Sequence, residues 1–317
     1  MTVPTIDTQA MTAPPLRLLI LVNPNASRAA EAVPPVAKWF AERDHLLVVV
    51  DSQEELEARL RRDGPGAARI VIGGGDGTLS EALPALIELG KPVAVLPLGT
   101  ANDFAHTLGL SLDPLAAAKI ALEGNEHAID VGLANGTPFL NVASVGLASQ
   151  VAAEQSKALK RRWRVFAYAI GLMRAARDMQ PFVVDVAIDG GAPWSAAVHQ
   201  VSIANGRHHG GGLIVAEDAA IDDGQLDLYI VHPGTLWQLF TCLTHLRFGL
   251  MRPAVLDRHR ATRVTLRTTR PRQVNADGRF VTTTPAEFEL LRHGLTVIVP
   301  PGQHQDTRGL AELAAQA

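Results

Sequence analysis

The stretch that decides the fold class is "VIGGGDGTLSEAL", residues 71–83. An apolar run typical of a buried strand leads into three glycines, an acid, a further glycine and a threonine, and a helical pattern follows at once. A glycine-rich turn between a strand and a helix lets backbone N–H groups approach an anion, and the helix dipole assists. The stretch therefore predicts a phosphate-binding turn inside an α/β unit.

This turn matches neither of the two common nucleotide-binding signatures. The spacing of the Walker A loop (Gly-x-x-x-x-Gly-Lys-Ser/Thr) and that of the dinucleotide fingerprint (Gly-x-Gly-x-x-Gly) are both absent from it. The turn also has no lysine, and the charge of Asp76 would repel a bare phosphate. We therefore expect Asp76 to act through Mg²⁺ or as a base toward a hydroxyl. The alternative is an ordinary acid in a glycine turn.

The residues around the turn alternate between short apolar runs and helical patterns, from residue 17 to residue 122. One of the helical patterns begins with a capping box, in which Ser52 precedes Glu55 by three residues. Such alternation predicts a mostly parallel sheet with helices on both faces, where ligands bind at the carboxyl ends of the strands. Three turns fall at that edge: "NPNAS" (23–27), "GGGDGTLS" (73–80) and "PLGTANDFA" (97–105).

After about Ile129 the pattern changes to strands rich in β-branched residues, interrupted by a helical segment at about 151–179. The second domain is therefore predicted to be mostly β, a sandwich or an open barrel, closed by "LTVIVP" (295–300). We expect a disordered tail at 1–15, an α/β nucleotide-binding domain at 16–128, a β-rich substrate and metal domain at 129–300, and a C-terminal tail or helix at 301–317 that packs back on the first domain.

The composition fits a two-domain cytoplasmic protein. A chain of 317 residues is long for one core, and its 47% of apolar residues is ample for two. The net charge of −3 gives no reason to expect nucleic acid as a partner. The single cysteine, Cys242, cannot form an internal disulfide, which fits a reducing cytosol. We expect no membrane span and no signal peptide.

Two turns carry the most specific pattern: Gly74-Gly75-Asp76-Gly77-Thr78 and Pro97-Leu98-Gly99-Thr100-x-Asn102-Asp103-Phe104-Ala105. In this order they resemble the catalytic domain of the diacylglycerol kinase family, in particular the soluble bacterial lipid kinases related to sphingosine and ceramide kinases. The resemblance continues through "NVASVGLASQV", "ANGRHHGGGLIVAEDAAIDDGQLDLYIV" and "NADGRF", and covers roughly residues 16–301. It implies an NAD-kinase-like fold with ATP bound by the α/β domain and the site between the domains.

The resemblance assigns the nucleotide site to ten residues: Asn23, Gly74, Gly75, Asp76, Gly77, Thr78, Leu79, Ser80, Thr100 and Asn102. The chain departs from the family after Asn23, because Asn25 to Arg28 stand where relatives usually have a glycine; Ser27 could still donate to a phosphate. Asn102 and Asp103 also lie where a helix begins, so the alternative is that they only cap that helix.

The resemblance also implies a structural Mg²⁺ held by Asp223 and the main-chain carbonyls of Ala220 and Gln225. The segment 217–227 is rich in oxygen ligands, which Mg²⁺ prefers. The alternative is a polar hairpin turn at Asp223-Gly224. His208 and His209 lack a further ligand at zinc spacing, so we interpret them as loop or substrate-site residues.

The general base is the main departure from the family. The triplet Asp277-Gly278-Arg279 stands where the family has Asp-Gly-Glu, whose glutamate is the base in the bacterial enzymes. An arginine cannot accept a proton at neutral pH. Asp76 is our first choice as the catalytic base, and Asp277 is the neighbouring alternative. Arg279 could stabilise the phosphate charge if it points inward; otherwise the chain is a weak or inactive kinase.

The expected substrate is a diacylglycerol-like lipid, with sphingoid bases, ceramide and phosphatidylglycerol left open. The segment 156–177 mixes basic and aromatic residues, which suits peripheral contact with an anionic membrane at its inner face; the alternative is a solvated basic helix. A second apolar candidate is 234–251. Two other functions stay open, an NAD kinase and a regulator that has lost catalysis. No nucleic acid is expected, and a homodimer is left open.

Overall fold

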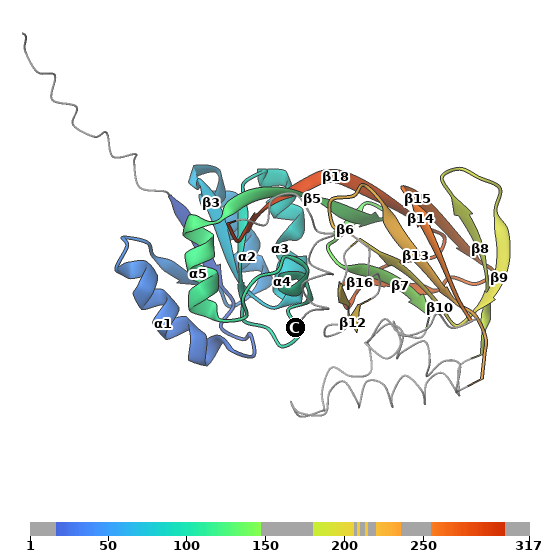
Figure 1. Cartoon of the computed structure of the whole chain (residues 1–317), viewed down its shortest axis with the longest axis horizontal. Coiled ribbons are helices and arrows are strands. Elements are labelled where there is room, and N and C mark those ends of the chain that lie inside the picture. The colour runs from blue at the N-terminus through green and yellow to red at the C-terminus, as the bar shows by residue number, and fades with distance from the viewer. Residues whose placement is uncertain are drawn as a thin grey trace, which may run out of the picture.

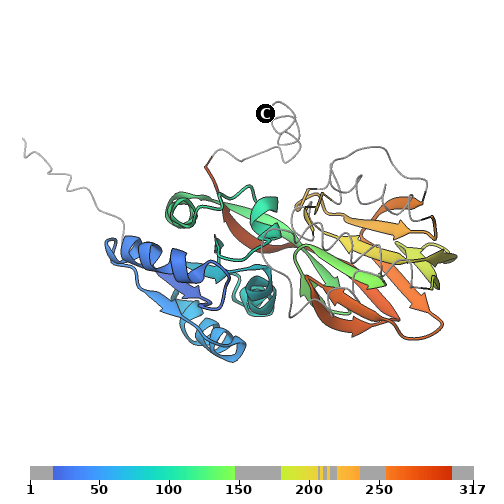
Figure 2. The ribbon, with the colours of Figure 1, turned by 90° about the horizontal axis from the view of Figure 1, so that it is seen from below.

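The computed structural model describes residues 17–146, 180–205, 208–209, 213–214, 220–235 and 255–301. Figure 1 shows an α/β part and a β-rich part that lie next to each other along the longest axis, with the strands β5 and β18 running between them. The same arrangement is visible from below in Figure 2. The predicted fold class, an α/β part followed by a β sandwich, is confirmed.

The first part alternates strands and helices. Its elements are β1 (Leu18–Val22), α1 (Ala29–Ala41), β2 (Leu47–Val49), α2 (Gln53–Asp63), the 3₁₀ helix η1 (Gly64–Gly66), β3 (Arg69–Gly74), α3 (Asp76–Leu89), β4 (Val93–Pro97), α4 (Asp103–Thr107) and α5 (Pro114–Glu123). The strands are parallel and lie in the order β2-β1-β3-β4. The order reverses between β1 and β3, which is where such sheets bind ligands.

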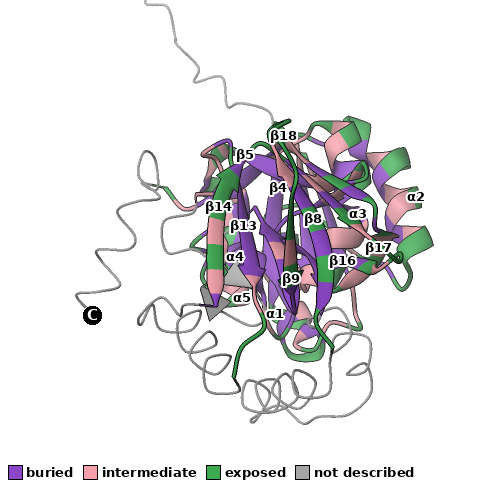
Figure 3. Cartoon of the chain, turned by 90° about the vertical axis from the view of Figure 1, so that its right-hand side faces the viewer, coloured by how far each residue is buried: buried purple, intermediate pink, exposed green. Residues whose placement is uncertain are grey.

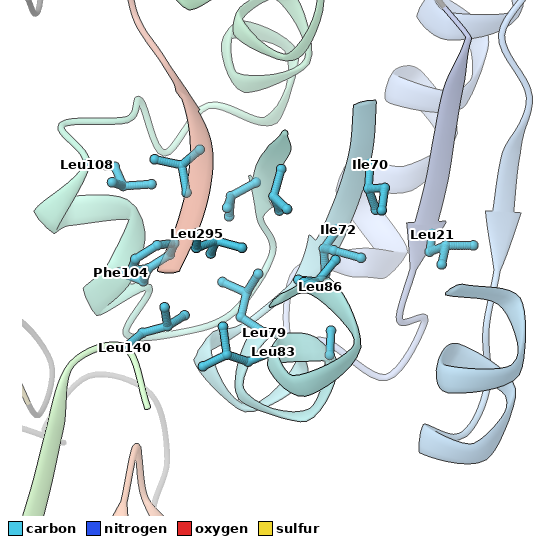
Figure 4. Close-up of a cluster of buried hydrophobic side chains, with 14 of the residues drawn as sticks. Leu21, Ile70, Ile72, Leu79, Leu83, Leu86, Phe104, Leu108, Leu140 and Leu295 are labelled. Carbon is cyan, nitrogen blue, oxygen red and sulfur yellow. The ribbon is translucent and has the colours of Figure 1, made fainter. Parts of the chain in front are cut away.

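Helices cover both faces of this parallel sheet because apolar side chains point to both sides of each strand. Ile20 and Val71 pack with residues of α1 and α5, whereas Leu21 and Ile72 pack with residues of α2, α3 and α4. Figure 4 shows the second cluster, in which Leu79, Leu83 and Leu86 of α3 lie beneath the sheet. The sheet is thus the middle of three layers, and its carboxyl edge carries the turns.

The second part is an antiparallel β sandwich. Its strands are β5 (Asn125–Ala134), β6 (Thr137–Phe139), β7 (Val142–Gly146), β8 (Phe182–Ile188), β9 (Trp194–Val198), β10 (Gln200–Ala204), β11 (His208–His209), β12 (Leu213–Ile214), β13 (Leu226–Val231), β14 (Leu256–Ala261), β15 (Arg263–Thr268), β16 (Gln273–Ala276), β17 (Arg279–Thr283) and β18 (Ala286–Val299). One sheet has the order β14-β13-β10-β7-β16-β17. Its inner face packs on β8, β15 and β18, and Figure 3 shows the buried residues along these strands.

Strand β18 belongs to both parts of the molecule. Its first half pairs with β15 of the sandwich, and Val297 near its end pairs in parallel with Val93 of β4. The register shifts between Leu291 and Leu295, and His293 there has φ of +51°. Such an irregularity bends a strand. Strand β18 therefore joins β4 of the first part to β15 of the sandwich, and one continuous sheet runs in the order β2-β1-β3-β4-β18-β15-β8-β9.

Several predicted segments lie outside the described residues: the tail at 1–15, the helical segment at 151–179, most of 234–251, and the C-terminal segment after 301. Across the part of the chain that the structure describes, no helix has both the length and the apolar character needed to cross a bilayer.

Candidate functional site

The three predicted turns meet at the carboxyl edge of the parallel sheet. The side-chain amide of Asn23, after β1, donates to Thr78 Oγ1 of α3 over 3.0 Å. The hydroxyl of Thr100, after β4, donates to Ser27 Oγ over 2.9 Å. The turns that follow β1, β3 and β4 therefore lie together at the carboxyl edge, next to the point between β1 and β3 where the strand order reverses.

The two glycine turns touch each other through their backbones. A Cβ atom built on Gly75 would lie 3.0 Å from the Cα of Gly99, and one built on Gly99 would lie 2.5 Å from the Cα of Gly75. Asn102 holds Gly99 from the other side, because its side chain accepts from the Gly99 N–H and donates to the Gly99 carbonyl, both over 2.9 Å. The amide of Asn102, which has φ of +53°, is thus engaged within the protein and positions the turn.

The first turn of helix α3 points backbone N–H groups at this edge. Gly75 is the N-cap, and no described side chain caps the helix there. Gly77 is exposed, and a Cβ atom on it would meet nothing within 4 Å. The side chain of Leu79 is buried in the core, so only its backbone can face the turn. Ser80 is half-buried. An uncapped helix N-terminus beside an open glycine is suited to a phosphate.

Asp76 is the first residue of α3 and is half-buried. Its Oδ1 accepts a hydrogen bond of 3.0 Å from the N–H of Phe104 in α4. Burial raises the pKa of the Asp76 carboxyl and the charge of Asp103 adds to the rise, while the N–H groups of Phe104 and Asp103 oppose it. A carboxylate with a raised pKa is a better proton acceptor near neutral pH than an ordinary aspartate.

Asp277 lies in a two-residue hairpin between β16 and β17. Asp277 and Gly278 have φ of +48° and +80°, which is the signature of a type I′ turn. The Asp277 carboxylate accepts from three consecutive N–H groups, those of Leu140 (2.8 Å), Asn141 (2.9 Å) and Val142 (3.2 Å). It therefore fastens the hairpin to the turn before β7.

The surroundings of Asp277 act on its pKa in opposite directions. Burial raises the pKa of Asp277 to about 6, and the charge of Asp76 adds to the rise. The three N–H donors lower the pKa but do not outweigh the burial. The two carboxyl groups are therefore within electrostatic reach of each other. Arg279 begins β17 opposite Ala276 and is half-buried. Its guanidinium has no hydrogen bond or ion pair with any residue that the structure describes.

The segment of the predicted metal residues forms a turn that closes on itself. Asp223 Oδ1 accepts from the N–H of Gln225 over 3.0 Å, and its Oδ2 accepts from the N–H of Ala220 over 3.5 Å. The guanidinium of Arg260 is 3.9 Å from the same carboxylate, whose pKa is raised by burial. Within the described ranges no three His, Cys, Asp or Glu residues gather as metal ligands, but a site of one carboxylate and two carbonyls needs no such cluster.

Asp130 in β5 is a buried acid that the sequence analysis missed. Its Oδ2 accepts from the N–H of Gly224 and its Oδ1 from the N–H of His293, both over 2.8 Å, and its own N–H donates to Ile221. It thus joins the 220–225 turn to β5 and to the irregularity in β18. The signal in the sequence is a lone acid inside the apolar run "AIDVGLA" (128–134).

The structure thus brings most of the predicted nucleotide residues to one edge and puts Asp277 near Asp76. The predicted metal residues belong to a separate turn beside β5. His208 and His209 form the short strand β11, which pairs with β12 and packs near α4. Their side chains lie outside the described part of the chain.

Comparisons with known proteins match both parts of the chain to known families. Residues 17–134 match the model of the diacylglycerol kinase catalytic domain, and residues 141–299 match that of the YegS C-terminal NAD kinase beta sandwich-like domain. A protein of Shewanella frigidimarina (strain NCIMB 400), named "Probable lipid kinase YegS-like", is 31% identical over 239 residues, which are 74% of this chain and 77% of that protein.

Two solved structures are similar over most of the chain. A diacylglycerol kinase from Bacillus anthracis str. Sterne is 25% identical, with a TM-score of 0.69, and the match covers 90% of this chain and 97% of that one. An NAD kinase from Archaeoglobus fulgidus in complex with ATP is 12% identical, with a TM-score of 0.50 and a coverage of 93% and 98%. The second likeness shows the shared fold alone.

Proposed function

This chain belongs to the lipid kinase family that joins a diacylglycerol kinase catalytic domain to a YegS-type β sandwich, and from that premise we propose that it transfers the γ-phosphate of Mg²⁺-ATP to the hydroxyl of a diacylglycerol-like lipid. The observation that carries the proposal is the contact of the turns after β1, β3 and β4 beside the uncapped start of α3. The raised pKa of Asp76 at that position supports the transfer step.

In the proposed reaction the phosphates of ATP lie against the N–H groups of the first turn of α3. The lipid oxygen forms a bond to the γ-phosphorus, the bond from that phosphorus to the bridging oxygen breaks, and ADP leaves. The proton of the hydroxyl goes to the carboxylate of Asp76, which the Phe104 N–H holds in place. Phosphoryl transfer depends mainly on positioning and on stabilising charge.

Three other charged groups have proposed roles. Both oxygens of Asp277 accept backbone hydrogen bonds, so we rank it behind Asp76 as the base. Arg279 has no ion pair among the described residues, and we propose that it stabilises the charge of the transferred phosphate. Mg²⁺ enters with ATP and neutralises phosphate charge when bound. Asp223, with the carbonyls of Ala220 and Gln225, would hold a second, structural Mg²⁺.

The test is phosphate transfer by the purified chain from radiolabelled ATP, with Mg²⁺, to four lipids and to NAD. The lipids are diacylglycerol, phosphatidylglycerol, ceramide and sphingosine. We expect label in a lipid, with diacylglycerol the best acceptor, and none in NAD. Label in NAD alone would assign the NAD kinase function. ATP binding without transfer to any acceptor would favour the regulator, for which the arginine at position 279 is the supporting observation.

We also propose peripheral contact with an anionic membrane through the segment 156–177, which lies outside the described residues. Its support is the sequence pattern of basic and aromatic residues. Changing Arg161, Arg162 and Arg164 together to glutamine should reduce sedimentation with phosphatidylglycerol vesicles, and salt should weaken the binding of the wild type. Equal sedimentation of the two proteins would contradict this role.

A further inference from the structure

Two asparagines lie side by side in the sheet β14-β13-β10-β7-β16-β17, one at the start of a strand and one at the end of its neighbour. Asn141 directly precedes β7, and Asn205 directly follows β10. The two strands are antiparallel, with Val142 opposite Ala204, and the N–H of Asn205 donates to the carbonyl of Asn141 over 2.9 Å. The pair is therefore held in register by the sheet itself and not by a loop.

Both side chains are buried and both leave an oxygen without a partner. Asn141 is 4% exposed and Asn205 is 2% exposed. The Oδ1 atom of each is fully covered and accepts no hydrogen bond from any residue of the described part. A buried polar atom without a partner destabilises the fold, so two adjacent ones need an explanation.

The orientation of the Asn205 amide is fixed by its other end. Its Nδ2 donates to the carbonyl of Asp130 over 2.9 Å and to the carbonyl of Leu140 over 3.1 Å. A flipped amide would place its oxygen against these two carbonyl oxygens. For Asn205 the unpartnered atom is therefore the oxygen, so this side chain lacks a donor rather than an acceptor.

The neighbours of the pair add a further acceptor and place it beside the nucleotide turns. The carboxylate of Asp277, at the end of β16, accepts from the N–H of Asn141. Strand β6, which leads to Asn141, packs against α3, and strand β11, which follows Asn205, packs near α4. The region thus combines two amide oxygens with a carboxylate next to the elements that carry Asp76.

We propose that Asn141 and Asn205 bind the hydroxyl-bearing headgroup of the acceptor lipid through their side-chain oxygens. A hydroxyl donates a hydrogen bond and carries no charge, so it matches a group of acceptors that would repel an anion. The inference rests on the proposed lipid kinase function and adds the residues that position the acceptor. A buried water between the two oxygens is the competing explanation.

Asn141→Ala is the decisive variant, because no described hydrogen bond of that side chain is lost with it. We expect the KM for the lipid to rise about tenfold, the loss expected of one hydrogen bond, while the KM for ATP stays unchanged. The melting temperature should shift by less than about 3 °C. Gln273→Ala is the matched control, since Gln273 is an exposed amide at the far end of β16 in the same sheet.

Direct binding separates this inference from the proposed function. Titration of short-chain diacylglycerol, phosphatidylglycerol, ceramide and sphingosine without ATP should show a lipid that binds the wild type about tenfold more tightly than Asn141→Ala. Such binding without phosphate transfer would leave the inference standing and defeat the kinase proposal. Equal affinity and equal lipid KM in the two proteins would overturn the inference and assign the oxygens to a water. Absence of binding by every lipid would also overturn it.

Discussion

Two glycines in the same turn have different reasons to be glycine. A Cβ atom on Gly75 would press on the backbone of Gly99, whereas one on Gly77 would enter open space at an exposed position. Gly75→Ala therefore tests the contact between two turns as much as the approach of a phosphate. Packing within the protein therefore explains the glycine at position 75 but not the one at position 77.

We predict that Gly77→Ala lowers ATP affinity while leaving the melting temperature unchanged or slightly higher, because alanine favours the helix. Gly75→Ala should lower both. Isothermal titration with ATP and thermal unfolding of the two variants check this. If ATP binds Gly77→Ala as it binds the wild type, the start of α3 does not face the phosphates.

For Asp76 we predict that Asp76→Asn lowers turnover by roughly a hundredfold to ten-thousandfold with little change in ATP affinity, as expected when a general base is lost. The asparagine oxygen can still accept from Phe104, so the fold should hold. Turnover of the wild type should fall as the pH drops through the raised pKa of Asp76, because the base must be deprotonated. Steady-state kinetics across pH measures both effects. Arg279→Glu should lower turnover if Arg279 stabilises the transferred phosphate, and should keep or raise turnover if the restored glutamate serves as the base instead. A nearly silent Asp76→Asn would point to another base.

Asp277 gives a stability prediction. Asp277→Asn should cost about 1–3 kcal/mol, since both oxygens accept N–H bonds and an amide nitrogen cannot. The folded pKa of about 6 is above the ordinary 3.8, so the folded state of the wild type binds the proton more tightly. This contribution is complete below pH 3.8 and is lost as the pH rises through 6. The advantage of wild type over variant in urea unfolding should therefore shrink by up to about 3 kcal/mol from pH 4 to pH 7. A constant gap would contradict the raised pKa.

At the residue level, the sequence identified side chains that follow strands in a local pattern. Asn23, Thr78 and Thr100 could be placed at one edge because parallel strands share their carboxyl ends. Asp130, Asn141 and Asn205 could not, because their roles depend on which distant strands become neighbours. The Asp277-Gly278 hairpin has a local signal in the sequence, an Asp-Gly pair between two strand-like runs.

At the scale of elements, the capping box of α2 could be predicted because it is local, whereas Asn102 at the start of α4 makes no side-chain capping bond and holds Gly99 instead. Ser52 accepts from the N–H of Glu55 over 3.1 Å at the start of α2, as the capping box predicts. The Glu55 side chain in turn accepts from the N–H of Asp51 over 3.1 Å. The length of β18 was not readable in this way, because its two halves pair with different parts of the molecule.

The 220–225 turn is the element on which a metal prediction can be tested. Asp223→Ala should reduce the stabilisation that Mg²⁺ gives in thermal unfolding without nucleotide, if this turn binds the ion. Gly224 remains tied to Asp130 in that variant, which limits damage to the turn itself. An equal Mg²⁺ response in variant and wild type would leave Asp223 as a residue of a self-closed turn. Asp222→Ala is a control, because Asp222 pairs with His127 at 3.1 Å instead.

At the scale of the whole molecule, the two parts are joined by packing as well as by chain. Leu140 belongs to the core of the first part, while the neighbouring Phe139 belongs to the core of the sandwich. Figure 4 shows Leu140 near Phe104 and Leu295 in the first core. The N–H of Leu140 also donates to Asp277 of the sandwich hairpin. The residues that flank the site therefore contact both cores.

This continuity predicts that the two parts unfold together. Leu295 is 4% exposed and lies in β18 where the strand enters the first sheet, so Leu295→Ala should cost about 2–5 kcal/mol by leaving a cavity. Leu46→Ala is the control, because Leu46 is 80% exposed. Calorimetry should show one transition that moves to lower temperature for Leu295→Ala and stays in place for Leu46→Ala. Two separate transitions, with only the earlier one shifted, would mean that the sandwich is stable without the first part, and that β5 and β18 connect the parts without coupling their unfolding.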